Sequence, residues 1–269
     1  MTLLNGIAIV IATIVIGSII YVVAGRFSPE GGRENRVPTS VYAVTAGAMS
    51  LLIAFTLSLT FERYVSAQTA AAQDAEAVLE LSRDATYMSP KVRDELRNQL
   101  VCYAEETINI VWPALRRGDT RPQPAPSKTL DRMEATIAAD LKGADNGLDE
   151  WATDNDMRSV AHVELLQIAG SSVPPILWML LIAGSLITVG SLVVYADRAK
   201  PAWGHVVVII GPLFIASAAL VVIAFFDHPY TDTPGGIQPT AMELVLQRMT
   251  ESPVKGLPLP KCPHPVPQA

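Results

Sequence analysis

Charged residues are scarce in this chain, at 17% of 269 residues against 50% hydrophobic residues. Soluble domains average about 25% charged residues, so this balance excludes an ordinary soluble protein. A helix needs about 20 residues to cross a ~30 Å hydrocarbon core, and four uncharged apolar stretches of the sequence are long enough. They are residues 3–24, 41–61, 173–195 and 204–226. The sequence therefore predicts a multi-pass membrane protein.

Motifs for catalysis and for cofactor binding are missing. The sequence has no glycine-rich phosphate loop, no zinc-ligand spacing and no nucleophile motif, so we expect no enzyme and no cofactor. The four histidines are scattered. Asp227 and His228 are adjacent, but no third ligand converges on them, so no metal site is predicted.

Strand patterns of useful length are also missing, which favours an all-α fold. We expect four transmembrane helices, with a helical water-soluble domain inserted between the second and the third. The expected parts are residues 1–61, a transmembrane pair; 62–172, an acidic helical domain; 173–226, a second pair; and 227–269, a tail with a short amphipathic helix and a proline-rich end. The tail helix, with Met242, Leu246 and Met249 apolar, either lies on the membrane surface or docks onto the bundle.

The first apolar stretch has two interpretations. It has no basic residue ahead of it, and its apolar run exceeds the 7–15 residues of a signal-peptide core, so we interpret it as a retained anchor. The alternative is a cleaved signal, for which no clean small-x-small cleavage site follows.

Charge distribution predicts the orientation. Residues 62–172 hold 12 Lys/Arg and 19 Asp/Glu, a formal charge of 12 − 19 = −7, which excludes nucleic acid as a partner. The short linkers 25–40 and 196–203 are basic instead. They contain Arg26, Arg33, Arg36, Arg198 and Lys200. The positive-inside rule then places the linkers in the cytoplasm and the central domain and tail outside.

Only two cysteines are present, Cys102 in the central domain and Cys262 in the tail. Both fall on the same side of the membrane in either orientation. Outside the cell they can form a disulfide that fixes the tail to the domain. The alternative of two unpaired thiols stays open, because sequence does not show proximity.

The second apolar stretch passes directly into Glu62, Arg63 and Tyr64 with no proline or glycine at the junction, which predicts one helix continuing to about residue 88. Around an axis, a ring of Glu62 would concentrate cations and a ring of Arg63 would concentrate anions. Adjacent residues point about 100° apart, so only one can face a pore. The alternative is an interfacial anchor, with Arg63 snorkelling and Tyr64 in the aromatic belt.

Several separated motifs resemble those of the bacterial bestrophin-like family, between about residues 41 and 249. They are LLIAF…ERY, the pair Glu76-Ala77, WPALRRG from Trp112 to Gly118, PPILW before the third span and FDHPY after the fourth. More distantly, the second span and the order of elements resemble the bestrophin ion channels.

The resemblance to bestrophins implies a pentameric homo-oligomer whose second helices line an ion pore with a hydrophobic neck. Carried over by position, the neck falls at Gly47, Leu51 and Phe55. Gly47 departs from the family's pattern, in which bulky side chains narrow the pore. The alternative for these residues is ordinary helix packing. Bestrophins keep the large domain in the cytosol, which conflicts with the charge distribution; we retain the orientation predicted by charge.

The preferred hypothesis is an oligomeric bestrophin-like ion channel or pore with weak cation preference, lined by the second transmembrane helix. A −7 domain around the vestibule would enrich cations. The rival is a non-conducting accessory protein that docks a larger envelope or membrane complex through its acidic domain and tail. Both hypotheses place the chain in the lipid bilayer of a bacterial plasma membrane.

Overall fold

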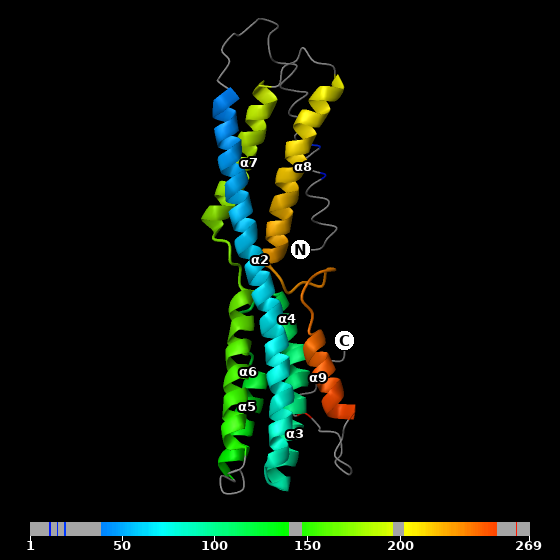
Figure 1. The fold of residues 1–269 in the computed structure, drawn as a ribbon. Helices are drawn as coiled ribbons and strands as arrows, with labels where there is room; N and C mark the ends of the chain where they lie inside the picture. The colour runs from blue at the N-terminus through cyan, green and yellow to red at the C-terminus, as the bar shows by residue number, and fades with distance from the viewer. Residues whose placement is uncertain are drawn as a thin grey trace, which may run out of the picture. The chain divides into compact units, whose positions relative to one another are not determined.

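The computed structural model describes residues 39–139, 147–195 and 202–251, with single positions at 11, 15, 19 and 262. Within these residues the secondary structure is helical and contains no strand, which confirms the all-α prediction there (Figure 1). Two of the described helices are long and apolar enough to cross a membrane, Ala43–Tyr87 and Ile210–Asp227, and a shorter apolar helix covers Pro175–Ser191.

The number of spans stays a prediction. The first expected span, residues 3–24, lies outside the described residues except for three helical positions at Ile11, Val15 and Ile19. The third expected span corresponds to α7 (Pro175–Tyr195) and the fourth to α8 (Ala202–Asp227).

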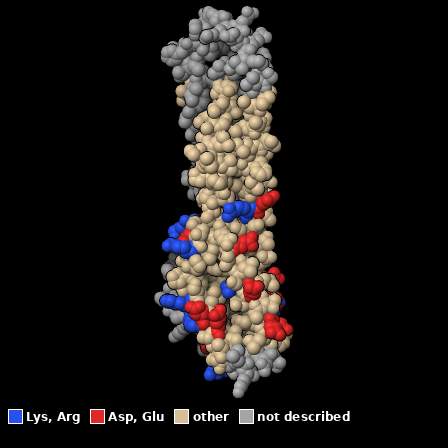
Figure 2. Space-filling view, turned by 90° about the vertical axis from the view of Figure 1, so that its left-hand side faces the viewer, with Lys and Arg blue, Asp and Glu red and all other residues tan. Residues whose placement is uncertain are grey.

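The chain divides into two compact units. One, here called the apolar unit, comprises residues up to Tyr64 together with Ser172–Asp227; the other, the polar unit, comprises Val65–Ser171 together with residues from His228 onward. The helix α2 (Thr39–Asp84) begins in the first and ends in the second. In Figure 2 the described charged side chains gather over one part of the chain, and the other part shows almost none.

The apolar unit contains the first part of α2, α7 and α8. Its core is formed by Met49, Leu181, Ile223 and Val173. At Gly184 of α7, an added Cβ atom would lie 2.5 Å from the sulfur of Met49, so glycine is what allows this close packing.

Asp227, the last residue of α8, binds the segment that comes just before α7. Its Oδ1 atom accepts hydrogen bonds from the backbone N–H of Ser172 at 2.7 Å and of Val173 at 3.0 Å, and from the Ser172 hydroxyl at 2.8 Å. These N–H groups lie just ahead of α7, where a helix has no acceptors of its own. Asp227 is 2% exposed, so its buried carboxylate is stabilised by these three donors.

The polar unit contains the remaining helices. They are η1 (Ala85–Tyr87), α3 (Pro90–Glu106), η2 (Thr107–Val111), α4 (Trp112–Arg116), α5 (Pro124–Ala139), α6 (Leu148–Ala169) and α9 (Thr240–Glu251). The sequence predicts a single helix over 90–117 with a kink at Pro113. The structure has a π-helix, η2, before the proline, because Pro113 has no N–H to continue the regular ladder.

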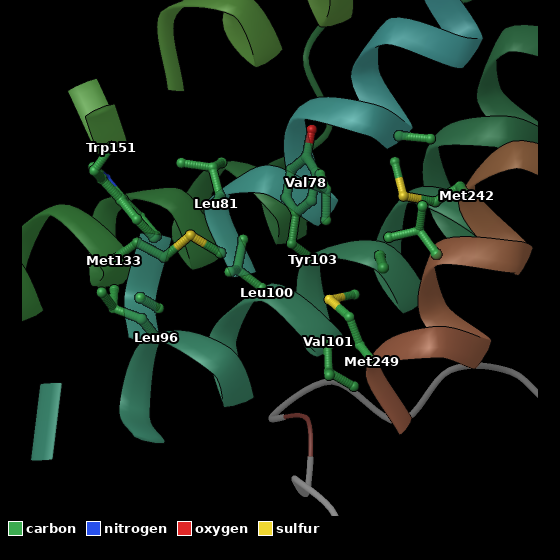
Figure 3. Close-up of a cluster of buried hydrophobic side chains, with 14 of the residues drawn as sticks. Val78, Leu81, Leu96, Leu100, Val101, Tyr103, Met133, Trp151, Met242 and Met249 are labelled. Atoms are coloured by element: carbon green, nitrogen blue, oxygen red, sulfur yellow. The ribbon is translucent and has the colours of Figure 1, made fainter. Parts of the chain in front are cut away.

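The core of the polar unit is built around α3 (Figure 3). Leu96, Leu100 and Tyr103 recur at steps of three and four residues, which places them on one face of the helix, and all three are fully buried. Met242 and Met249 of α9 join the same cluster. The tail helix therefore docks onto the bundle.

A buried polar cluster connects α2, α3 and α6. The Tyr103 hydroxyl lies 3.4 Å from the carboxylate of Asp74, 3.2 Å from His162 Nδ1 and 3.3 Å from the guanidinium of Arg158. Burial raises the pKa of Tyr103, as does the charge of Asp74, so the phenol stays neutral and can donate. The Tyr103 hydroxyl thus has polar partners on two other helices, α2 and α6.

A disulfide joins Cys102 of α3 to Cys262, with their Cα atoms 5.3 Å apart. Cys102 is buried, at 5% exposure. The bond connects residues separated by 160 positions in the sequence, so it fixes the far end of the tail to the bundle.

Removing this disulfide should destabilise the polar unit. A bond that closes a long loop restricts the unfolded chain and typically contributes about 2–4 kcal/mol. We expect the double variant Cys102→Ser, Cys262→Ser to melt at a lower temperature than the wild type, measured by circular dichroism in mild detergent. Reductant should lower the melting temperature of the wild type and leave that of the double variant unchanged. If reductant changes both melting temperatures by the same amount, the result would contradict the disulfide.

Asp84, at the end of α2 in the polar unit, gives a pH-dependent prediction. It is 8% exposed, and burial, followed by Asp154, Glu80 and Glu150, raises the pKa of its carboxyl group from 3.8 to about 6. Between these values the folded state holds a proton that the unfolded state has released, so stability falls as the pH rises from about 4 to about 6.

Asp84→Asn should therefore stabilise the polar unit at pH 7.5, by about 1–3 kcal/mol, and have little effect at pH 4. Thermal melts at both pH values measure this difference. Asp131→Asn, at an exposed carboxylate, is the matched control and should change neither melt. A gain from Asp84→Asn that is equal at both pH values would show that charge is not the cause.

Candidate ion pathway along α2

One face of α2 is exposed along nearly the whole helix. Exposed positions recur at steps of three and four residues, which is the spacing of a single helical face. They are Val44, Gly47, Leu51, Ala54, Phe55, Ser58, Glu62, Val65, Thr69, Ala72 and Glu76. This set is here called the exposed face of α2.

The opposite face of α2 is covered by its own chain. Met49, Thr56 and Thr60 are buried within the apolar unit, and Ala67, Ala70, Asp74, Val78 and Leu81 are buried within the polar unit. Among the described residues, α2 thus has one packed face and one face without a partner in each unit.

The predicted neck residues lie together on the exposed face. Leu51 is 72% exposed and Phe55 is 62% exposed. A Cβ atom added at Gly47 would meet nothing within 4 Å. The structure therefore brings Gly47, Leu51 and Phe55 onto one stripe, and nothing in the described part of the chain covers it.

The exposed face differs in composition from the other exposed surfaces of the apolar unit. On α7 and α8 most of the exposed residues are large, for example Ile176, Leu186 and Phe214, although Ala183 and Gly190 of α7 are exposed too. On α2, small and hydroxyl residues alternate with Leu51 and Phe55. These are Gly47, Ala48, Ser50, Ala54 and Ser58. Small residues are enriched where membrane helices meet and are not required against lipid, so this face is suited to contact with other helices or to lining a passage.

Glu62 and Arg63 point in different directions, as their adjacency predicts. Glu62 belongs to the exposed face, and Arg63 is half-buried and engaged with other groups of its chain. Tyr64 packs against Phe226 at 5.2 Å between ring centroids and against Phe225 at 6.3 Å. Of the two charged residues, Glu62 is the one available to an axis.

Two hydroxyls of α2 are turned inward. Thr56 donates to the carbonyl oxygen of Leu52 at 2.9 Å, and Thr60 donates to that of Thr56 at 3.0 Å. These bonds satisfy the hydroxyls within their own helix, as is usual in membranes. Ser58 is the hydroxyl residue on the exposed face in this stretch.

Two of the quoted sequence motifs meet in the polar unit. Trp112, from WPALRRG, makes an edge contact with Tyr230, from FDHPY, at 5.6 Å between centroids. The Tyr230 hydroxyl donates to the carbonyl oxygen of Leu165 at 3.3 Å. Arg116 of the first motif forms a salt bridge with Asp232 at 2.8 Å. These motif residues therefore hold the segment after α8 against the bundle.

Sequence reasoning missed the role of Asp227, which it considered only as half of a metal pair. Within the described residues, no group of three or more His, Cys, Asp or Glu side chains could hold a metal ion. The sequence did contain a signal for this role. Asp227 is a carboxylate at the end of the fourth apolar stretch, and the backbone N–H groups at the start of the third apolar stretch need acceptors from outside their own helix.

Comparison with known proteins gives a family and a fold. A family model described as "Bestrophin-like domain" matches residues 11–241. No curated protein matches the chain.

Solved structures share the fold at low sequence identity. A crystal structure described as a bacterial bestrophin homologue from Klebsiella pneumoniae, phased by Zn-SAD, is 12% identical, with a TM-score of 0.71 over 91% of this chain and 97% of that one. A tryptophan-to-alanine variant of that homologue is 13% identical, with a TM-score of 0.71 over 93% and 97%. A structure described as a membrane protein with a proline-to-alanine change is 12% identical, with a TM-score of 0.70 over 92% and 98%.

Identity at this level shows the fold, and the family model covers most of the chain. Together with the two-faced α2 and the apolar helices, these findings establish that the chain belongs to the Bestrophin-like family.

Proposed function

We propose that this protein forms a homo-oligomeric ion pore lined by α2. The observation that supports the proposal best is the exposed face of α2, which carries small and hydroxyl residues through the apolar unit and is not covered by the described residues of the same copy. A cyclic assembly would bury the edges of this face between copies and direct its centre at the axis. The resemblance to bestrophins favours five copies.

The proposed constriction is formed by Leu51 and Phe55. They lie one helical turn apart, and rings of both side chains would make a short apolar tube. Such a tube can close by dewetting, because ions do not cross it without their water. Gly47, one turn before Leu51, would leave the tube wider at its level.

The proposed selectivity is a weak preference for cations. The charged members of the exposed face are Glu62 and Glu76, and neither Lys nor Arg is exposed between residues 44 and 76. Rings of carboxylates concentrate cations, and the charge of −7 over residues 62–172 acts in the same direction.

The proposed orientation places the polar unit outside the cytoplasm. Disulfides persist in oxidising compartments, so the bond between Cys102 and Cys262 favours this side. The basic linkers independently favour the cytoplasm for the opposite side. This orientation is the reverse of the cytosolic placement that the resemblance to bestrophins implies.

Substitutions on the exposed face should change conductance in opposite directions. Phe55→Ala should raise single-channel current in planar bilayers, because it widens the apolar tube. Gly47→Leu should lower the current, because it extends the tube into open space without a clash inside its own chain. Phe214→Ala is the matched control, since Phe214 is 53% exposed on α8 and should leave the current unchanged.

A current that is the same in wild type, Phe55→Ala and Phe214→Ala would reject the apolar constriction. A purified protein that is monomeric in mild detergent and conducts nothing would reject the pore itself and favour the accessory role.

The orientation is testable with the two native cysteines. In intact cells of the native host, treated with a membrane-impermeant reductant and then with an impermeant maleimide, we expect Cys102 or Cys262 to become labelled. The double variant Cys102→Ser, Cys262→Ser should stay unlabelled. Labelling that requires cell lysis would place the polar unit in the cytoplasm.

A further inference from the structure

The basic residues of the polar unit are unevenly distributed. Residues 116–128, which run from the end of α4 into α5, hold four Lys/Arg and one acidic residue, a formal charge of 4 − 1 = +3. The rest of residues 62–172 holds 8 Lys/Arg and 18 Asp/Glu, a formal charge of 8 − 18 = −10. Residues 116–128, here called the basic segment, therefore form a positive region in an acidic unit. Its four basic residues are all exposed, and they are Arg116, Arg117, Arg121 and Lys128.

The turn at the start of the basic segment has a defined backbone. Helix α4 ends at Arg117, and Gly118 follows in the left-handed conformation, with a φ of 72°. The N–H of Gly118 donates to the carbonyl oxygen of Leu115 at 2.9 Å, and the N–H of Asp119 donates to that of Ala114 at 3.0 Å. This pair of bonds is the Schellman motif, which ends a helix and fixes the turn after it.

The guanidinium groups of this turn differ in their partners. Arg121 donates to the Asp119 carboxylate from Nε and from Nη2, both at 2.9 Å, and this lowers the pKa of Asp119, which therefore stays ionised. Arg116 forms its salt bridge with Asp232. Among the described residues, no hydrogen bond or ion pair engages the guanidinium of Arg117. Arg117 thus keeps all five of its N–H donors for a partner outside these residues.

Two contacts connect the basic segment to chain that is close to the expected membrane spans. A Cβ atom added at Gly118 would lie 3.5 Å from the carbonyl oxygen of Ala169, and α7 begins six residues after Ala169. The salt bridge of Arg116 reaches Asp232, and α8 ends five residues before it. Six residues span at most about 20 Å when fully extended. Chain length alone therefore keeps the basic segment near the membrane surface.

The chemistry of the segment selects a phosphate on that surface. An arginine guanidinium matches a phosphate group with two parallel hydrogen bonds. Basic residues beside a bilayer are attracted to anionic lipids. A nucleic acid also offers phosphates, but the charge of −10 on the rest of residues 62–172 would repel it.

We propose that the basic segment binds the phosphate of an anionic lipid headgroup, with Arg117 as the principal contact. Arg121 and Lys128 add positive charge, and the fixed turn presents Arg117 without loss of backbone freedom on binding. The site depends on neither oligomer formation nor conduction, so a failed pore would leave it intact.

Cross-linking in nanodiscs tests the site on the full-length protein. A photo-cross-linking residue is placed at Pro122, which is exposed and follows Arg121, and the discs contain equal parts of phosphatidylglycerol and phosphatidylcholine. Mass spectrometry should show more cross-links to phosphatidylglycerol than to phosphatidylcholine. Arg117→Gln should lower this ratio about fivefold, the typical share of one basic residue at an anionic surface, and Arg117→Glu should lower it further.

A matched control removes the same charge far from the membrane. Helix α2 continues for 20 residues from Tyr64 to Asp84, about 30 Å, and Lys91 follows in the first turn of α3. Lys91 is exposed, like Arg117. Lys91→Gln should leave the cross-linking ratio at Pro122 unchanged, and Arg117→Lys should keep most of it. Circular dichroism should show the same helix content in every variant.

Three outcomes would overturn the proposal. One is a ratio that is the same in wild type, Arg117→Gln and Lys91→Gln. The second is a ratio that inorganic phosphate lowers more than sodium chloride of equal ionic strength does, which would show a site for the free anion. The third is cross-links at Pro122 that go to protein and not to lipid, which would show that another chain covers the segment.

Discussion

The uncovered face of α2 is the constraint on which the rest of the molecule depends. A helix in a membrane forms all of its backbone hydrogen bonds internally. Which residues its side chains contact is therefore decided by packing and not by backbone hydrogen bonding. The packed face of α2, through Met49 and Thr56 in one unit and Val78 and Leu81 in the other, holds the helix to its own chain. On the exposed face no described residue covers Gly47, Leu51, Phe55 and Glu62, and the mixture of small, hydroxyl and acidic neighbours around them is a poor match for lipid.

Hydrogen-bond satisfaction explains most of the remaining polar groups. Asp227 accepts three bonds at the start of α7, and Thr56 and Thr60 donate to carbonyls of their own helix. In the polar unit the Tyr103 hydroxyl connects three helices through Asp74, Arg158 and His162. Some buried atoms of the described residues lack a hydrogen-bond partner, among them Asp74 Oδ2, Trp112 Nε1 and Ser185 Oγ. The disulfide adds a covalent restraint at the far end of the tail.

Much of the fold could be predicted from the sequence, because its signals are local. The unbroken helix through Glu62 follows from residues that favour helix and from the absence of Pro and Gly at the junction. Other features needed the structure. The three prolines of DTRPQPAPS, residues 119–127, are typical of a loop, but α5 begins at Pro124, since proline fits the first turn of a helix. The exposed face of α2 was not predictable from apolar spacing, because inside a membrane both the packed and the uncovered face are apolar.

The central claim is that the exposed face of α2 surrounds an axis. An electron cryo-microscopy map of the purified protein, at a resolution that shows side chains, tests this claim most directly. We expect a closed ring of copies in which α2 is the innermost helix, with Leu51 and Phe55 of every copy pointing at the centre. A map in which these two side chains contact lipid, or in which a single copy stands alone, would contradict it.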